Sequence, residues 1–343
     1  MGNTTGKAVA PYRRRAHHAG SWYAKEPQAL QATLTQYLQQ ATTSSTSSST
    51  AAATTVRAIL CPHAGYSYSG PTAAYSYSAL QTELQQRAAA AAAANNSAST
   101  TTTTIIVLHP SHHVYLQGCA VSGAVVLETP VGDLPVNDAV RQELLQTGLF
   151  TIMTAEEDEH EHSGEMQYPY LAQIIRNCNI SIGKNVVTVL PIMCGALQAG
   201  AEARYGQILA PLLARPDVIT VISTDFCHWG KRFAYQPVPP TKGSATSSIP
   251  IHQFIQQMDQ RGMDLIAMDW RRPGAFADYL RQTRNTICGR HAVAVWLQAL
   301  AATYPATAAV QPKITFVKYA QSSAAQSMAD SSVSYAAAVC TLE

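Results

Sequence analysis

The chain has 343 residues, of which 47% are hydrophobic and 13% charged, with 23 Lys and Arg against 21 Asp and Glu. A near-neutral chain of this length can bury a large core, and it lacks the clustered basic face that nucleic-acid binding requires. No segment reaches about 18 consecutive apolar residues, so we expect no membrane insertion, and the N-terminal region shows no secretory signal. The one basic run, Arg13-Arg14-Arg15, is predicted to be a solvated terminal arm.

Apolar runs of strand length alternate with helix-like stretches along the chain. Several of the apolar runs are continuous, as in strands that are covered on both faces. We predict an α/β fold, with one αβα layered domain over residues 1–343 around a central mixed β-sheet. The strand-like runs are 56–62, 104–109, 119–127, 186–192, 218–223 and 314–319. The helix-like stretches are 27–40, 137–147, 166–177, 199–214, 251–260, 273–284 and 290–304.

Two tracts of low complexity interrupt this alternation, near residues 41–55 and 88–104. They consist largely of Ala, Ser and Thr and have little apolar bulk to pack, so flexible surface loops are predicted. The alanine run in the second tract can also extend a preceding helix by a few turns. A third stretch, 237–250, is rich in Pro, Ser and Thr and is expected to be flexible.

The seven cysteines are widely spaced, and no two of them form a Cys-x-x-Cys pair. An odd number of cysteines in mostly apolar runs predicts buried free thiols rather than a disulfide framework. We therefore expect a reducing compartment, the cytoplasm or the nucleus. The cysteines are Cys61, Cys119, Cys178, Cys194, Cys227, Cys288 and Cys340.

Four segments that carry histidine or cysteine lie far apart, each where we expect a strand to end. In an open α/β sheet, strand ends of one polarity meet at a common crevice. Imidazole and thiolate groups gathered there favour a metal site. The segments are 61–66, 109–113, 225–229 and 286–291.

The first two segments supply candidate imidazole ligands. His63 follows a strand-ending proline and precedes Ala64 and Gly65, whose small size lets the backbone approach a bound group. Of the adjacent His112 and His113, at most one is expected to face a shared ion. A histidine that only caps a turn is the alternative reading.

The other two segments supply a carboxylate, a third imidazole and a thiol. Asp225 and His228 are three residues apart after a buried strand, so the carboxylate can orient the imidazole, or the pair can act as a general base. Cys288 lies near the start of a predicted helix, where the dipole favours the thiolate that binds metal. A helix-capping Asp with a packed His, and an inert buried Cys, are the alternatives.

The densest acidic cluster, 156–165, favours a solvated charge run. Within it His162 and Glu165 are three residues apart and can reach the crevice, with Glu165 as an acid–base partner. No dinucleotide-binding, P-loop, serine-hydrolase or His-Glu-x-x-His motif is found in the sequence, which disfavours nucleotide cofactors, serine hydrolases and common zinc peptidases.

Taken in order, these motifs resemble the Memo family (mediator of ErbB2-driven cell motility) over nearly the whole chain. The resemblance implies a fold similar to class III extradiol dioxygenases, in which two histidines and a glutamate hold Fe(II). The matching segments are 18–23, 62–66, 110–113, 161–166, 223–230, 285–291, 319–323 and 330–337.

Carried onto this chain, the resemblance implies His63, His112 and Cys288 as metal ligands, with cysteine in place of the carboxylate. A thiolate is softer and shifts the preference toward copper or a different iron chemistry. The resemblance also implies redox signalling in cell motility and the binding of phosphotyrosine-containing peptides or signalling proteins.

Three functions follow as hypotheses. The first is a copper- or iron-dependent oxidase-type protein, in which Asp225, His228 and His162 orient ligands or move protons. The second is a non-enzymatic adaptor that binds a phosphopeptide in the crevice with help from Arg290. The third, ranked below both, is a zinc hydrolase with water at an open fourth position.

Overall fold

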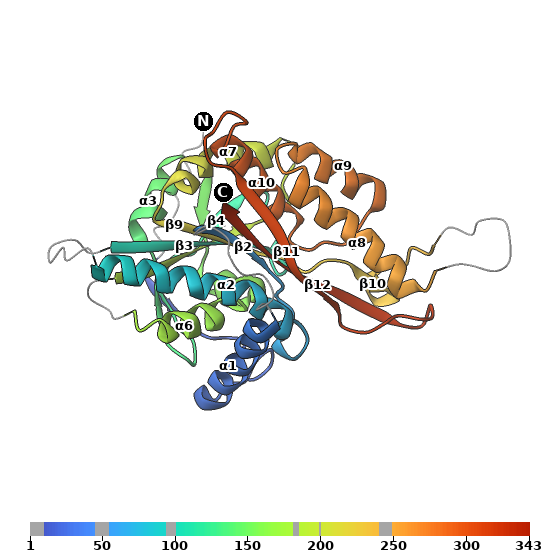
Figure 1. The fold of residues 1–343 in the computed structure, drawn as a ribbon, viewed down its shortest axis with the longest axis horizontal. Coiled ribbons are helices and arrows are strands. Elements are labelled where there is room, and N and C mark those ends of the chain that lie inside the picture. Colours follow the sequence, from blue (N-terminus) through green and yellow to red (C-terminus); the bar gives the residue numbers. More distant parts are fainter. Residues whose placement is uncertain (1–9, 45–54, 94–100, 181–184, 199, 240–248) are drawn as a thin grey trace.

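The protein is described by a computed structural model over residues 10–44, 55–93, 101–180, 185–198, 200–239 and 249–343 (Figure 1). The strands are β1 (Tyr12–Arg14), β2 (Thr55–Cys61), β3 (Thr101–Pro110), β4 (Cys119–Val121), β5 (Ala124–Leu127), β6 (Leu134–Pro135), β7 (Phe150–Ile152), β8 (Asn185–Cys194), β9 (Val218–Ser223), β10 (His228–Gly230), β11 (Pro312–Gln321) and β12 (Ser331–Leu342). The helices are α1 (Pro27–Ser44), α2 (Tyr66–Ala93), α3 (Asp138–Gln146), α4 (Ala155–His160), α5 (His162–Glu165), α6 (Tyr168–Asn177), α7 (Ala201–Ala214), α8 (Ile251–Met268), α9 (Pro273–Thr283) and α10 (Arg290–Thr303), with a 3-10 turn, η1 (Lys231–Phe233).

Within the described ranges, the main sheet has nine strands, in the order β10-β12-β2-β9-β3-β8-β4-β7 with β11 paired to β12. The central strands β2, β9, β3 and β8 are mutually parallel, whereas β12 and β4 pair antiparallel with their neighbours β2 and β8. A smaller sheet joins β1, β5 and β6. The mixed sheet confirms the predicted α/β class.

Helices cover both faces of the main sheet, which gives the αβα layers that the sequence predicts (Figure 1). One face packs against α1, α2 and α6, where Leu30, Leu34 and Leu38 of α1 recur every fourth residue and are buried. The other face packs against α7, α10, α8 and α9, with Trp296 of α10 fully buried. The central strands are therefore apolar on both faces, as their continuous apolar runs indicate.

The predicted run 119–127 is two strands in different sheets. Val121 ends β4 in the main sheet, and Ala124 begins β5 in the small sheet. A Cβ on Gly123 would lie 2.8 Å from the Ile152 side chain and 3.1 Å from the Met153 carbonyl oxygen. The chain changes sheets at a position where only glycine fits.

One long helix and one long strand were not among the predicted elements. Helix α2 contains Pro71 and many small or polar residues, so it has no clear apolar period, yet Tyr77 and Leu80 are fully buried. Strand β12 is rich in alanine, a weak strand former, and is held between β11 and β2. Tertiary pairing and burial decide both elements.

The parts of the low-complexity tracts that the structure describes form helix and strand, so the loop prediction is wrong there, whereas the alternative that the alanine run extends a helix is confirmed. Ala41 is fully buried and continues α1, the alanine run extends α2 to Ala93, and Thr101–Thr104 begins β3. The parts 45–54 and 94–100 lie outside the described residues, as does 240–248 of the third stretch.

The prediction of a solvated basic arm at Arg13-Arg14-Arg15 is wrong. Arg14 is 1% exposed and donates to Asp158 Oδ1 at 2.9 Å and to Glu165 Oε2 at 2.7 Å. Its two arginine neighbours, Arg13 in β1 and Arg15 just after it, keep exposed side chains and form ion pairs with Glu128 and Glu159. The carboxylates that hold Arg14 are more than a hundred residues away, so the local charge run carried no sign of them.

A buried carboxylate on α8, Asp259, makes folding stability depend on pH. It accepts hydrogen bonds from Asn285 Nδ2 and Tyr319 Oη, both at 2.9 Å. Burial outweighs these bonds and raises the pKa of Asp259 from 3.8 to about 6. Its contribution to stability is therefore fully present below about pH 4 and is lost as the pH rises through 6.

We expect the Asp259→Asn substitution to remove this dependence. The difference in unfolding free energy between the variant and the unmodified chain should shift by about 2 kcal/mol between pH 4 and 7, in favour of the variant at pH 7. Urea denaturation at both pH values measures it, with Asp264→Asn on the same helix as the control. A difference that is the same at pH 4 and pH 7 would contradict the prediction.

Candidate metal centre

Parallel strands bring three of the four predicted segments to one edge of the sheet. His63 follows the end of β2, Asp225 follows β9 and His112 follows β3. Because β9 lies between β2 and β3 and all three run parallel, their carboxyl ends are adjacent. The predicted convergence of these segments is confirmed.

Cys288 reaches the same place by a different route. The prediction that its segment follows a strand is wrong. The segment joins α9 to α10. Gly289 is the N-cap of α10, and a Cβ on it would lie 2.5 Å from the Ser223 carbonyl oxygen and from the Thr224 side chain. Its amide donates to Thr224 Oγ1 at 3.0 Å, so this glycine packs the Cys288 segment onto the end of β9.

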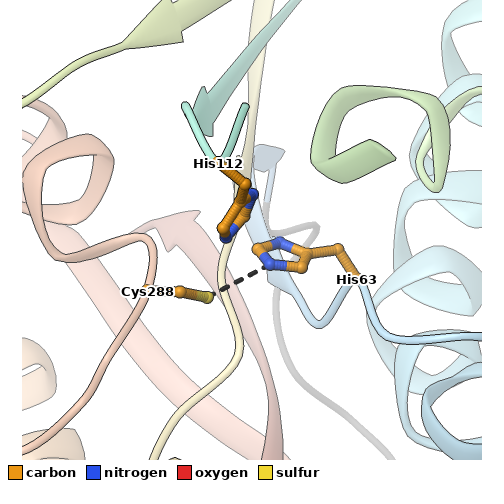
Figure 2. Close-up of side chains that lie close together, drawn as sticks. All are labelled: His63, His112 and Cys288. Atoms are coloured by element: carbon orange, nitrogen blue, oxygen red, sulfur yellow. Dashed lines mark hydrogen bonds between the residues drawn. The ribbon is translucent and has the colours of Figure 1, made fainter. Parts of the chain in front are cut away.

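The two imidazoles and the sulfur share one space (Figure 2). The Cys288 Sγ atom lies 3.1 Å from His63 Nε2, and one ligand atom each of His63, His112 and Cys288 lie within 4.8 Å of one another. A single ion with bonds of about 2.0–2.3 Å requires donor atoms at this kind of separation. The arrangement is a candidate centre for one metal ion.

Hydrogen bonds behind His63 set its tautomer. The Ser223 hydroxyl donates to the Ser163 carbonyl at 2.7 Å and accepts from Gln167 Nε2 at 2.9 Å. Since its proton is already used, this hydroxyl accepts from His63 Nδ1 at 2.8 Å. The Nε2 lone pair of His63 is then directed to the shared space. Burial, followed by the charge of neighbouring imidazoles, lowers the pKa of His63 and keeps the ring neutral.

The ring of His112 is oriented by Glu161, a carboxylate that the sequence analysis left unassigned. It is 1% exposed and accepts from His112 Nδ1 at 2.8 Å and from the His112 amide. Burial lowers the pKa of His112, but its bonds to Cys288 and Glu161 raise that pKa to about 10. A metal ion at Nε2 would therefore displace a proton from His112. The only sequence signal for Glu161 is its place beside His162.

Asp225 and His228 line the crevice but do not pair with each other. Asp225 Oδ1 accepts from the His63 amide at 2.8 Å, while its own amide donates to Cys288 Sγ at 3.3 Å. His228 Nδ1 lies 2.9 Å from the Phe226 carbonyl oxygen and 3.0 Å from that of Thr286. Asp225 thus orients the ligand backbone rather than the His228 ring, and the two carbonyl oxygens favour the His228 tautomer whose acceptor is Nε2.

His162 is the middle ring of a stack that leads from the crevice wall to the candidate ligands. Its centroid lies 4.2 Å from that of Trp22 and 4.5 Å from that of His112, with interplanar angles of 28° and 27°. Burial and the charge of His112 lower the pKa of His162 to about 3. His162 is therefore a neutral ring at ordinary pH.

Glu165 does not reach the crevice. It is fully buried, and its carboxylate accepts from Arg14 Nη1, from the His18 amide at 2.8 Å and from Tyr23 Oη at 2.6 Å. Arg14 also donates to the Glu161 carbonyl at 3.0 Å. The pair fixes the segment that carries Glu161 and His162, which is a structural role.

The crevice above the ligands has a volume of about 580 Å³. His63, His112, His162, Asp225 and His228 line it. Its wall also includes residues that the sequence analysis did not single out as site residues, and Arg290 is not among those that line it. These additional residues are Trp22, Arg232, Phe233, Ser322 and Tyr335; Tyr68, whose hydroxyl the sequence offers for orienting a substrate, lines the crevice as well.

We expect the Glu161→Gln substitution to weaken metal binding by about 10–100-fold, because a carboxylate behind a ligating histidine fixes the ring and raises its basicity. In the metal-free chain it should also lower the pKa of His112 from about 10. Competition with a chromophoric chelator and an NMR titration of the ring measure the two effects. Glu156→Gln, an exposed position on α4, is the control. Equal affinities for both variants would contradict the role of Glu161.

The fold and the site define an α/β protein with a histidine–cysteine candidate metal centre at the ends of parallel strands. The family model described as Memo-like protein matches residues 14–339, and the chain belongs to this Memo family. Among the described residues, no helix combines the length and hydropathy that a membrane crossing requires.

Relatives from distant animals align with nearly all of the chain. "Protein MEMO1" of Danio rerio is 37% identical over 94% of this chain and 96% of its own length, and that of Homo sapiens is 36% identical over 96% and 97%. "Protein memo-1 homolog" of Caenorhabditis elegans is 37% identical over 95% and 82%. An uncharacterised Escherichia coli K12 protein of known structure, JW3007, aligns with 82% of this chain at 14% identity and a TM-score of 0.44.

Proposed function

We propose that the chain binds one copper or iron ion between His63, His112 and Cys288 and performs oxidase-type redox chemistry in the crevice. The observation that supports this proposal is the approach of the three donor atoms to within 4.8 Å of one another. They come from segments that are remote in the sequence. Each has a hydrogen-bonding partner behind it that orients it.

The donor set favours a redox metal of intermediate softness. Two imidazoles suit copper, iron and zinc alike, whereas a thiolate shifts the preference toward softer ions such as Cu(I). Cys288 lies beside the N-terminus of α10, and the Asp225 amide donates to its sulfur, which holds this soft donor atom at the two imidazoles. Copper or iron, when bound, supplies one-electron exchange with a reductant and with dioxygen.

The protein side chains around the ligands would bind and orient a substrate and move its protons. His228 Nε2 can accept a proton from a molecule in the crevice because its Nδ1 atom faces two carbonyl oxygens. His162 and Trp22 provide flat apolar ring surface beside His112. In this proposal the chemistry serves signalling linked to cell motility, as the family resemblance implies.

Metal identification on protein purified anaerobically without chelators tests the proposal. We expect about one copper or iron ion per chain by mass spectrometry, and dioxygen consumption with an added reductant that a chelator abolishes. His228→Gln should slow this consumption without loss of metal. Protein that holds neither metal, or whose dioxygen consumption survives complete chelation, would contradict the proposal. One zinc ion per chain would favour the hydrolase hypothesis instead.

A second function is supported by the cation in the crevice wall. We propose as the alternative that the crevice binds a phosphotyrosine-containing peptide or signalling protein without catalysis. Arg232 lines the crevice together with the aromatic residues Trp22, Tyr68 and Phe233. A guanidinium pairs well with phosphate, and aromatic walls suit a tyrosine ring. Arg290, which the sequence analysis expects to bind the phosphate, is exposed and does not line the crevice. In this proposal Arg232 binds the phosphate instead.

Calorimetry with a phosphotyrosine peptide distinguishes the two functions. We expect Arg232→Gln to weaken binding by roughly tenfold or more, since a charged hydrogen bond contributes about 1.5–3 kcal/mol. Arg290→Gln is the matched control and should leave the affinity unchanged. If both variants bind like the unmodified chain, or if the unphosphorylated peptide binds equally well, the adaptor proposal is wrong.

A further inference from the structure

Two cysteines outside the candidate metal centre lie directly opposite each other in the main sheet. Cys119 of β4 pairs with Cys194 of β8 in an antiparallel register. Both are 2% exposed, and both belong to the core cluster on the α7 and α10 face of the sheet. Their side chains therefore lie on the same side of the sheet, as neighbours across the two strands.

The hydrogen-bond pattern shows which kind of pair this is. The Gly195 amide donates to the Gly118 carbonyl at 2.9 Å, and the Ser122 amide donates to the Pro191 carbonyl at 3.1 Å. The Cys119 amide donates instead to Tyr205 Oη at 3.1 Å. Hydrogen-bonded pairs alternate with non-hydrogen-bonded ones along an antiparallel ladder, so Cys119 and Cys194 form a non-hydrogen-bonded pair.

This pair type brings two cysteines within bonding range. Opposed residues of this kind have Cα atoms about 4.5 Å apart and the closest Cβ atoms of the ladder. A disulfide requires Cα atoms roughly 4.4–6.8 Å apart, so the backbone needs little movement to allow one. The other cysteines on the sheet differ in this respect: Cys340 of β12 faces Ala58 of β2.

The pair also lies at the base of the loop that carries His112. In the parallel pairing of β3 with β8, Pro110 faces Cys194, and in the antiparallel pairing of β4 with β8, Cys119 faces Cys194. The segment 111–118 thus leaves the sheet on one side of Cys194 and returns to it on the other. A covalent bond here would fix the return of that segment.

We propose that Cys119 and Cys194 are a redox modification site that forms a cross-strand disulfide. This disulfide would restrain the segment 111–118, which carries His112, at the point where it returns to the sheet. The oxidant is a small hydroperoxide. One thiolate attacks the peroxide oxygen to give a sulfenic acid and releases water, and the second sulfur displaces the hydroxyl group as water. Two thiols and one hydrogen peroxide give one disulfide and two waters. A thiol reductant reverses the step.

Burial sets the rate of this reaction. It raises the pKa of Cys119, so little thiolate is present at neutral pH. Oxidation is therefore slow and depends on brief opening of the short strand β4. The same burial protects the finished disulfide from large reductants.

The test is thiol mapping of the full chain after graded hydrogen peroxide with a chelator present. We expect the thiols of Cys119 and Cys194 to be lost together, with a reducible cross-link between the peptides that carry them. Hydrogen exchange of the amides in 111–118 should slow at least several-fold in the linked protein. The Cys288→Ser chain should give the same link, so the result does not depend on the metal centre.

Matched variants decide the assignment. Cys119→Ser should abolish the link, and Cys340→Ser, an equally buried cysteine with no facing thiol, should retain it. The proposal is overturned if Cys119 and Cys194 stay as fully alkylated as Cys340 throughout the series, or if the link joins another pair. If the amides of 111–118 exchange hydrogen equally fast in the linked and the unlinked protein, the disulfide does not restrain this segment and that part of the proposal is overturned.

Discussion

Replacing Cys288 with serine is expected to lower the affinity of the chain for copper or iron by more than about 100-fold. Loss of a group behind a ligand already costs about 10–100-fold, and here the ligand itself is lost. A serine hydroxyl does not ionise near neutral pH and is a harder donor than sulfur. His63→Ala should have a similar effect, since it removes the imidazole 3.1 Å from the sulfur. Metal content after dialysis, followed by chelator competition, measures both.

Substitutions of one other cysteine and one other histidine serve as controls for these ligand substitutions. Cys178→Ser changes another partly exposed free cysteine, and His113→Ala changes the histidine next to His112. Neither residue belongs to the cluster of donor atoms. If all four variants hold as much metal as the unmodified chain, then Cys288 and His63 are not ligands.

Replacing Arg14 with methionine is expected to destabilise the fold by about 3–5 kcal/mol, because it leaves buried carboxylates without their cation. Asp158 and Glu165 are both almost fully buried and lie 2.9 and 2.7 Å from the guanidinium. Urea denaturation at neutral pH measures the change.

The neighbouring residue provides a matched control for Arg14. The side chain of Arg13 is 53% exposed and its ion-pair partners Glu128 and Asp133 are exposed as well, so Arg13→Met should leave the stability nearly unchanged. If both variants lose the same amount of stability, the burial of the Arg14 ion pairs does not account for the loss and the prediction is wrong.

Much of the architecture could be predicted because it depends on local patterns. Asn137 caps α3 by accepting from the Val140 amide, as its place before an apolar helix indicates. The continuous apolar run 218–223 coincides with β9, which is buried throughout. Histidines after such strands were placed at one edge of the sheet because parallel strands end on the same side.

Other features depend on partners that are distant in the chain. Glu161 appeared to belong to a solvated acidic run, yet it is buried behind His112. Arg14 likewise appeared to belong to a solvated arm. A charged side chain is stable in a core only when its counter-charge and hydrogen bonds come with it, and here these come from other segments.

The sequence by itself determined the layered α/β class, most of the helices and strands, and the types of side chain that gather at the strand ends. It did so because hydrophobic period, caps and strand polarity act over a few residues at a time. Only the tertiary structure decided that the Cys288 segment packs onto the end of β9, that Asp225 orients the His63 backbone rather than His228, and that alanine-rich β12 is a strand. Each of these depends on packing and hydrogen bonds between residues far apart in the chain, where no local pattern records the partner.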